Sequence, residues 1–168
     1  MKKGLLLALM MAATLLSVPS VRGDDIRNIP DCRYCGMDRK FFAHSRMLVE
    51  YADGTVCGTC SLNCAAIDYV KNLDNPPRSI KVGDYATKKL IDARKAFWVI
   101  GGSKRGVMTD RAKWAFERKR DALAFVKESG GTLAGFDQVM QAGYVDLYKD
   151  MRLVDRKLAR AHHVGTCQ

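Results

Sequence analysis

The first half of the chain alternates apolar and polar residues in a way that predicts a hairpin, a helix and a third strand. Asp53-Gly54 lies between two alternating segments and is a typical hairpin turn. Beyond it, apolar residues recur at helical spacing, and Ser61 is the expected N-cap of that helix. The predicted elements are strands at 47–51 and 55–59, a helix from residue 62 to about 70, and a strand at 79–85.

The second half repeats this order of elements with little residue identity. Gly101-Gly102 is expected to form a turn between two strands, and Gly130-Gly131 supplies the left-handed residue that ends a helix. The predicted elements are strands at 96–100, 113–117 and 132–136, with a helix before the last strand that Asp121 caps.

A charged segment near the C-terminus predicts an amphipathic helix. Tyr144, Leu147, Tyr148 and Met151 fall on one helical face of this segment. The expected fold is therefore α+β, with two small antiparallel sheets that are each covered by a helix. The predicted parts are a leader at 1–23, two tandem strand-strand-helix-strand units at 24–85 and 86–140, and an amphipathic helix with a polar tail at 141–168.

The N-terminus has the pattern of a secretory signal peptide. Lys2 and Lys3 precede an apolar run at 5–16 that is too short to span a bilayer comfortably. We expect cleavage after Gly23, with Ser20 as a competing site; the alternative is that the segment stays as a membrane anchor. The protein is thus expected to be exported, soluble or peripherally attached to a membrane, and located in the periplasm.

The chain carries a net charge of +10, which would suit nucleic acid, anionic lipid or an acidic partner. Export makes nucleic acid a poor choice. The sequence contains no recognisable Ser-His-Asp set, paired-carboxylate motif, phosphate loop or redox-cofactor fingerprint. We therefore expect a protein that is not an enzyme.

Cysteine is the most unusual feature of the composition. The chain has six cysteines, and all but Cys167 fall between residues 32 and 64. This clustering requires either disulfides or a metal. Cys32 and Cys35 are followed by Gly36 and Met37, so that two thiols and a thioether lie within six residues. Thiolate and thioether sulfur suit Cu(I) far better than calcium, magnesium or manganese.

Four separate motifs make the chain similar to the NosL family. They are Tyr34-Cys35-Gly36-Met37, the segment 91–101, Gly106-Val107-Met108, and Ala124-Phe125 with Gly130-Gly131. NosL proteins are Cu(I)-binding accessory proteins for assembly of the copper centres of nitrous oxide reductase, with a duplicated strand-strand-helix-strand fold. The resemblance implies that Cys35, Met37 and Met108 bind Cu(I). Cys32, which lies in the same cysteine pair as Cys35, is a candidate further ligand.

The implied function is a Cu(I) chaperone that delivers copper to a periplasmic cuproenzyme or its assembly complex, with nitrous oxide reductase as one candidate. Two features depart from the family. Typical members are lipoproteins, whereas this chain shows no lipidation cysteine, and the better-known members lack Cys57, Cys60 and Cys64. The additional cysteines are consistent with extra ligands, with disulfides or with a different copper acceptor. The oligomeric state is left open.

Two alternatives use the additional cysteines differently. Cys32-x-x-Cys35 with Cys57-x-x-Cys60 matches the spacing of a structural zinc ribbon, so Zn(II) is the alternative metal. Cys57-x-x-Cys60 also precedes a predicted helix, as the reactive pair of a thiol-disulfide exchange protein would. Cys60 and Cys64 lie one helical turn apart, and a disulfide or simple burial is about as compatible with that spacing as metal ligation.

Overall fold

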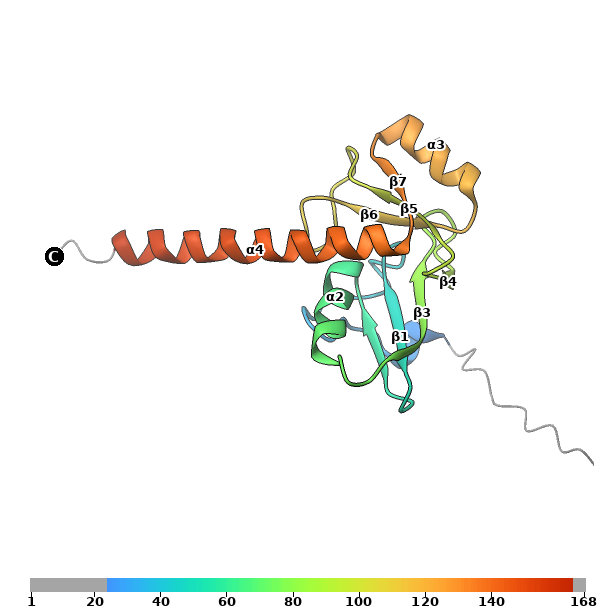
Figure 1. Cartoon of the computed structure of the whole chain (residues 1–168), viewed down its shortest axis with the longest axis horizontal. Helices are drawn as coiled ribbons and strands as arrows, with labels where there is room; N and C mark the ends of the chain where they lie inside the picture. The colour runs from blue at the N-terminus through green and yellow to red at the C-terminus, as the bar shows by residue number, and fades with distance from the viewer. Residues whose placement is uncertain (1–23, 165–168) are drawn as a thin grey trace, which may run out of the picture.

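The structure is a computed structural model that describes residues 24–164, with residues 153–164 described only as part of a helix. The predicted signal peptide and Cys167 lie outside the described residues. Two antiparallel sheets and four helices make up the described chain (Figure 1). The elements of the first part are α1 (Asp25–Asn28), β1 (Met47–Tyr51), β2 (Val56–Thr59), α2 (Leu62–Lys71), β3 (Pro77–Gly83) and β4 (Leu90–Asp92).

The first sheet has the strand order β2-β1-β3-β4. The predicted hairpin is present: β1 pairs with β2, and Gly54 in the turn has a φ of 87°. Val49 is paired with Cys57, so their side chains share the face of the sheet on which α2 packs. The sequence pattern did not predict β4, a three-residue strand whose side chains are not fully buried.

The second sheet has the order β6-β5-β7, so each sheet has the first strand of its unit between the next two. Its elements are β5 (Phe97–Ile100), β6 (Lys113–Phe116), α3 (Lys119–Ser129) and β7 (Thr132–Ala134). The prediction that Asp121 caps α3 is wrong. Arg118 is the N-cap, and Asp121 lies in the first turn, where its carboxylate accepts a hydrogen bond from the Arg118 guanidinium. Gly130 ends α3 with a φ of 75°, as predicted.

The C-terminal helix α4 (Phe136–Val164) begins ahead of the predicted boundary at 141 and extends well beyond the body of the protein (Figure 1). Its first turns pack on the core through Val139 and Met140. Gly143 lies against α2, where a Cβ would come within 2.7 Å of the Leu62 side chain. Among the described residues, no helix is both long and apolar enough to cross a membrane.

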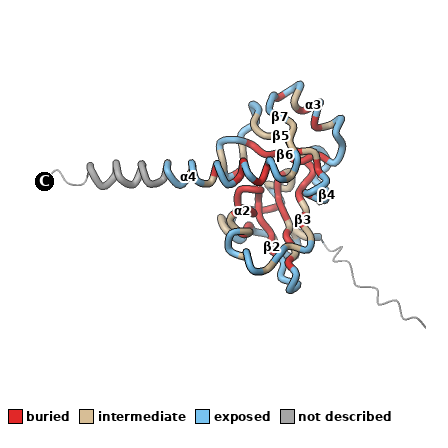
Figure 2. The backbone as a smooth tube through the Cα atoms, viewed as in Figure 1, coloured by how far each residue is buried: buried red, intermediate tan, exposed pale blue. Residues whose placement is uncertain are grey.

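The two sheets share one main core. Figure 2 shows the buried backbone gathered where the sheets, α2 and the start of α4 meet. Met47 and Val82 of the first sheet belong to the same apolar cluster as Trp98 and Ala115 of the second. A second cluster, on the side of α3, includes Cys32, Cys60 and Cys64 among its buried residues.

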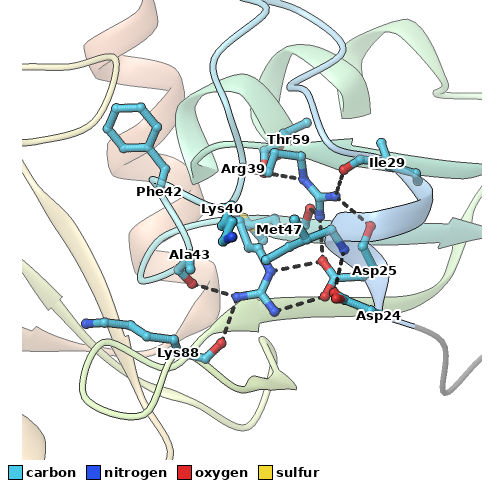
Figure 3. Close-up of polar contacts among 12 residues, drawn as sticks. Asp24, Asp25, Ile29, Arg39, Lys40, Phe42, Ala43, Met47, Thr59 and Lys88 are labelled. Atoms are coloured by element: carbon cyan, nitrogen blue, oxygen red, sulfur yellow. Dashed lines mark hydrogen bonds and ion pairs between the residues drawn. The ribbon is translucent and has the colours of Figure 1, made fainter.

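A buried ion pair network joins the N-terminal segment to the first sheet (Figure 3). Asp25 accepts hydrogen bonds from Arg39 and from both Nε and Nη2 of Arg46. The Arg39 side chain is fully buried and also donates to the carbonyl oxygens of Met47 and Thr59. These bonds fix the loop that follows the Cys-Gly-Met sequence against β1 and β2.

Candidate metal centre

Four thiol sulfurs converge at one point in the structure. The Sγ atoms of Cys32, Cys35, Cys60 and Cys64 all lie within 4.8 Å of one another. The Cys35–Cys60 separation is 3.5 Å, and Cys60–Cys64 and Cys64–Cys35 are both 3.8 Å. Cys35 is partly exposed, and the other three are buried. We call these four residues the thiol cluster.

A tight loop presents Cys32 and Cys35. The amide of Cys32 donates to the carbonyl of Met37, and the amide of Gly36 donates to the carbonyl of Cys32, both at 2.9 Å. Gly36 has a φ of 69°, a conformation that glycine adopts without the cost a side chain would bring. The sequence Cys-x-x-Cys-Gly-Met therefore closes on itself and turns both thiols toward α2.

The junction between β2 and α2 presents the other two thiols. Cys60 directly follows β2, and Ser45 Oγ fixes its backbone by donating to the Cys60 carbonyl at 2.8 Å. Ser61 is the N-cap, as predicted from its position, although its side chain makes no capping hydrogen bond. Cys64 lies in the first turn of α2.

The three buried sulfurs of the cluster perturb one another's protonation. Hydrogen bonds from the thiols of Cys60 and Cys64 strongly lower the pKa of Cys32. The pKa values of Cys60 and Cys64 are raised, chiefly because each donates to Cys32. A soft cation that replaces the protons shared among these thiols would be bound by thiolates.

Cys57 lies outside the thiol cluster. The pleat of β2 directs the Cys57 side chain into the main core opposite Val49. Cys64, not Cys57, is the fourth residue of the cluster. Burial and the nearby Asp68 raise the pKa of Cys57 to about 12. Among the described residues, the cluster therefore does not bring Cys57 together with Cys60, as the alternative zinc-ribbon set and the alternative redox pair of these two residues would require. None of the five described cysteines is in a disulfide.

Met37 and Met108 lie on the wall of one cavity of about 1080 Å³, which we call the methionine pocket. Met37 also packs against the second core cluster, to which the buried cysteines of the thiol cluster belong. Met108 is 44% exposed and has a φ of 60°, unusual for a residue with a side chain. Asn63 of α2 holds this backbone by donating to the Met108 carbonyl at 2.7 Å. The two distant loops therefore meet on the same side of the molecule.

A comparison with protein-family models shows the family to which this chain is related. The NosL family model matches residues 25–144, which include the thiol cluster and both methionines of the pocket. The chain belongs to the NosL family. A search of curated proteins found no match.

Two solved NosL structures are similar to this chain. The crystal structure of the copper chaperone NosL from Shewanella denitrificans is 24% identical, covers 74% of this chain and 99% of its own, and has a TM-score of 0.58. The two proteins therefore share a fold. The solution structure of apo-NosL from Achromobacter cycloclastes is 24% identical over 54% of this chain and 82% of its own, with a TM-score of 0.39.

The four predicted site residues of this NosL chain thus fall into two neighbouring groups. Cys32 and Cys35 belong to the thiol cluster, whereas Met37 and Met108 line the methionine pocket. For Cys60 and Cys64, the sequence is about as compatible with a disulfide or simple burial as with metal ligation. The signal that could have selected them is their spacing of four residues across the start of a helix, which places both sulfurs on one side of that helix.

His44 lines the same pocket. Its ring is half-buried and packs against Tyr85 and Trp114, with centroid distances of 5.8 and 5.4 Å. Burial, with a contribution from Lys88, lowers the pKa of His44. The imidazole is therefore neutral near pH 7 and faces a pocket that also holds two thioethers.

The donor set fits a soft metal ion. A tetrahedral centre with metal–sulfur bonds of about 2.3 Å has sulfur–sulfur separations of about 3.8 Å, close to those observed in the cluster. Both Cu(I) and Zn(II) accept thiolate ligands, whereas thioethers are characteristic of Cu(I) sites. The cluster by itself therefore suits either metal, and the adjoining methionines favour copper.

Proposed function

We propose that this protein is a Cu(I) carrier that receives the ion in its sulfur site and passes it to a copper-accepting protein. The observation that carries the proposal is the convergence of four thiols within 4.8 Å beside a pocket lined by Met37 and Met108. Membership of the NosL family and the shared fold with a copper chaperone support it. In this proposal Cys32, Cys35, Met37 and Met108 remain the predicted ligands, Cys60 and Cys64 join them as candidates, and the ion would use no more than four of these sulfurs at once.

Ligand exchange would move the ion through Cys35. This is the one partly exposed thiol of the cluster, and it lies two residues before Met37 on the pocket wall. An acceptor that reaches into the methionine pocket could replace the sulfurs one at a time. Cu(I) tolerates low coordination numbers, so each exchange could proceed without complete release of the ion. No covalent chemistry is required, which is consistent with a carrier rather than an enzyme.

We propose an exported acceptor, because the N-terminal sequence predicts secretion to the periplasm. Nitrous oxide reductase or its assembly complex is one candidate. The net charge of +10 would steer an acidic acceptor or support peripheral association with an anionic membrane. Co-purification of the tagged chain from its own periplasm tests this part separately from copper binding.

A titration of the reduced protein with Cu(I) against a competing chelator tests the metal site. Cys35→Ser and Met108→Leu should each weaken binding by about tenfold or more, since even outer-shell partners of metal ligands are worth that much. Met140→Leu is the matched control, because Met140 is buried in the core on α4. Unchanged affinity in both site variants would exclude the proposed ligands.

A structural zinc site is the second candidate function, favoured by the closed four-thiol geometry alone. Metal analysis of the isolated protein separates the two. Copper at one equivalent per chain, or an apo-protein that prefers Cu(I) to Zn(II) in competition, supports the carrier. Stoichiometric zinc that Cu(I) does not displace supports the structural site. Activity in an insulin-reduction assay without any metal would support thiol-disulfide exchange instead.

A further inference from the structure

A buried carboxylate on α2 connects the two segments that supply the thiol cluster. Asp68 is 2% exposed and accepts hydrogen bonds from the phenol groups of Tyr34, at 2.5 Å, and Tyr51. The amide of Asn72 donates to the same carboxylate oxygen as Tyr34, at 3.3 Å. Hydrogen bonds to an ionised group are among the stronger ones in proteins.

The positions of Tyr34 and Asp68 in the chain give this hydrogen bond its significance. Tyr34 lies between Cys32 and Cys35 in the tight loop. Asp68 follows Cys64 by one helical turn on α2. The bond therefore links the cysteine loop to α2, as a metal ion bound by the cluster would, but it lies outside the cluster.

Lys71 adds a second contact between α2 and Tyr34. Its Nζ lies 5.3 Å from the centroid of the Tyr34 ring, within the range of a cation–π interaction. The hydroxyl and the face of this ring are thus both held by the helix that carries Cys64. Tyr51, by contrast, belongs to β1 and lies outside the cysteine loop.

We infer that Asp68 is a positioning residue for metal binding: through Tyr34 it holds Cys32 and Cys35 at ligand distance from Cys64. This inference rests on the proposed metal-binding function. Holding the ligands in place before the ion arrives removes part of the ordering cost of binding. Loss of the bond would let the loop move away from α2, so the ion would be bound less tightly and reached more easily by an acceptor or by water.

The test compares Tyr34→Phe with Tyr51→Phe in the full chain. Each substitution removes one phenol hydroxyl from Asp68, but only the first frees the cysteine loop. Cu(I) affinity and the rate of Cu(I) extraction are measured with a competing chelator, and the melting temperature of each apo-protein is measured alongside. The luminescence of the Cu(I)-thiolate centre at full occupancy reports how well the site excludes water, which a general loss of stability would not change.

Tyr34→Phe should weaken Cu(I) binding by about tenfold, speed its extraction and reduce the luminescence, because a hydrogen bond to a charged group is worth about that factor. Tyr51→Phe should leave the affinity, the extraction rate and the luminescence within about twofold of the wild-type values, even if its melting temperature falls as far as that of Tyr34→Phe. Asp68→Asn should reproduce the Tyr34→Phe changes, and it provides the test if Tyr34→Phe does not fold.

Wild-type affinity and luminescence in Tyr34→Phe would overturn the positioning role. Equal losses in both phenylalanine variants would also overturn it, because they would show a general effect on the fold. If the wild-type protein itself does not bind Cu(I), the proposed function fails instead, so the two failures are distinguishable.

Discussion

The Sγ atoms of Cys35 and Cys60 lie 3.5 Å apart, although 25 residues separate them in the chain. This distance is far longer than the 2.05 Å of a disulfide and close to the separation of two sulfurs bound to one metal ion. The fold brings these residues together by closing the Cys-Gly-Met loop over the start of α2. The pair is therefore where the two halves of the proposed metal site meet.

Replacing Cys57, Cys60 and Cys64 one at a time should separate ligand thiols from structural ones. Cys60→Ser and Cys64→Ser are each expected to weaken Cu(I) binding by about tenfold or more, as estimated for loss of a ligand contact. Cys57→Ser is the control, because Cys57 lies in the main core outside the cluster. Chelator competition on all three reduced proteins provides the measurement. Wild-type affinity in all three variants would show that neither Cys60 nor Cys64 is a ligand.

Binding of Cu(I) should stabilise the fold, because the ion would join the cysteine loop to α2. At a free concentration of about 100 times Kd, the expected gain is about 2.7 kcal/mol. Thermal unfolding of the reduced protein with and without buffered Cu(I) measures it. Cys64→Ser should show much less of this gain, whereas a full gain in that variant would place the ion elsewhere.

Much of the fold follows from local sequence patterns. Asp53-Gly54 between alternating segments predicts the hairpin of β1 and β2, and Gly130 ends α3 in the left-handed conformation that its position suggests. The start of α4 was harder to predict. Phe136 suits the end of a strand as well as the first turn of a helix, and its contact with the core, which comes from tertiary packing, selects the helix.

The thiol cluster could be predicted only in part. Spacing alone pairs Cys57 with Cys60, and the same spacing occurs in zinc ribbons. Whether Cys57 or Cys64 joins the cluster depends on where β2 stops and α2 begins, since the pleat turns Cys57 into the core and the helix returns Cys64 to Cys60. Element boundaries are the least predictable feature of a sequence.

The network around Asp25 should make stability depend on acid pH. Burial raises the pKa of Asp25, but the hydrogen bond and charge of Arg46 and the charge of Arg39 outweigh it, and the net pKa is lowered. The contribution is therefore complete above the unfolded pKa of about 3.9 and is lost as pH falls through the lower folded pKa.

Asp25→Asn should accordingly cost about 3–5 kcal/mol near neutral pH, because it leaves Arg39 and Arg46 buried without their carboxylate. The variant should also lose less stability than the wild type when the pH is lowered from about 5 to about 2. Urea denaturation across this range tests both points, with exposed Asp74→Asn as the control. Parallel pH profiles for Asp25→Asn and the wild type would contradict the assignment.

A second buried pair fastens α4 to β6. Lys113 Nζ lies 2.7 Å from Asp146, and the two side chains are 3% and 7% exposed. Asp146→Asn should destabilise the protein by about 3–5 kcal/mol, since it leaves the Lys113 charge buried without a partner. The double variant Lys113→Met with Asp146→Leu should be less destabilised than the sum of its single variants. Urea denaturation of the three proteins checks this, and additive losses would show that the pair is not coupled.

X-ray absorption at the copper edge tests the central claim most directly, on reduced full-length protein loaded with one equivalent of Cu(I). Sulfur atoms should dominate the first coordination shell, and their number should fall in Cys60→Ser and in Cys64→Ser but not in Cys57→Ser. A first shell made mainly of nitrogen or oxygen, or the same sulfur count in all three variants, would contradict it.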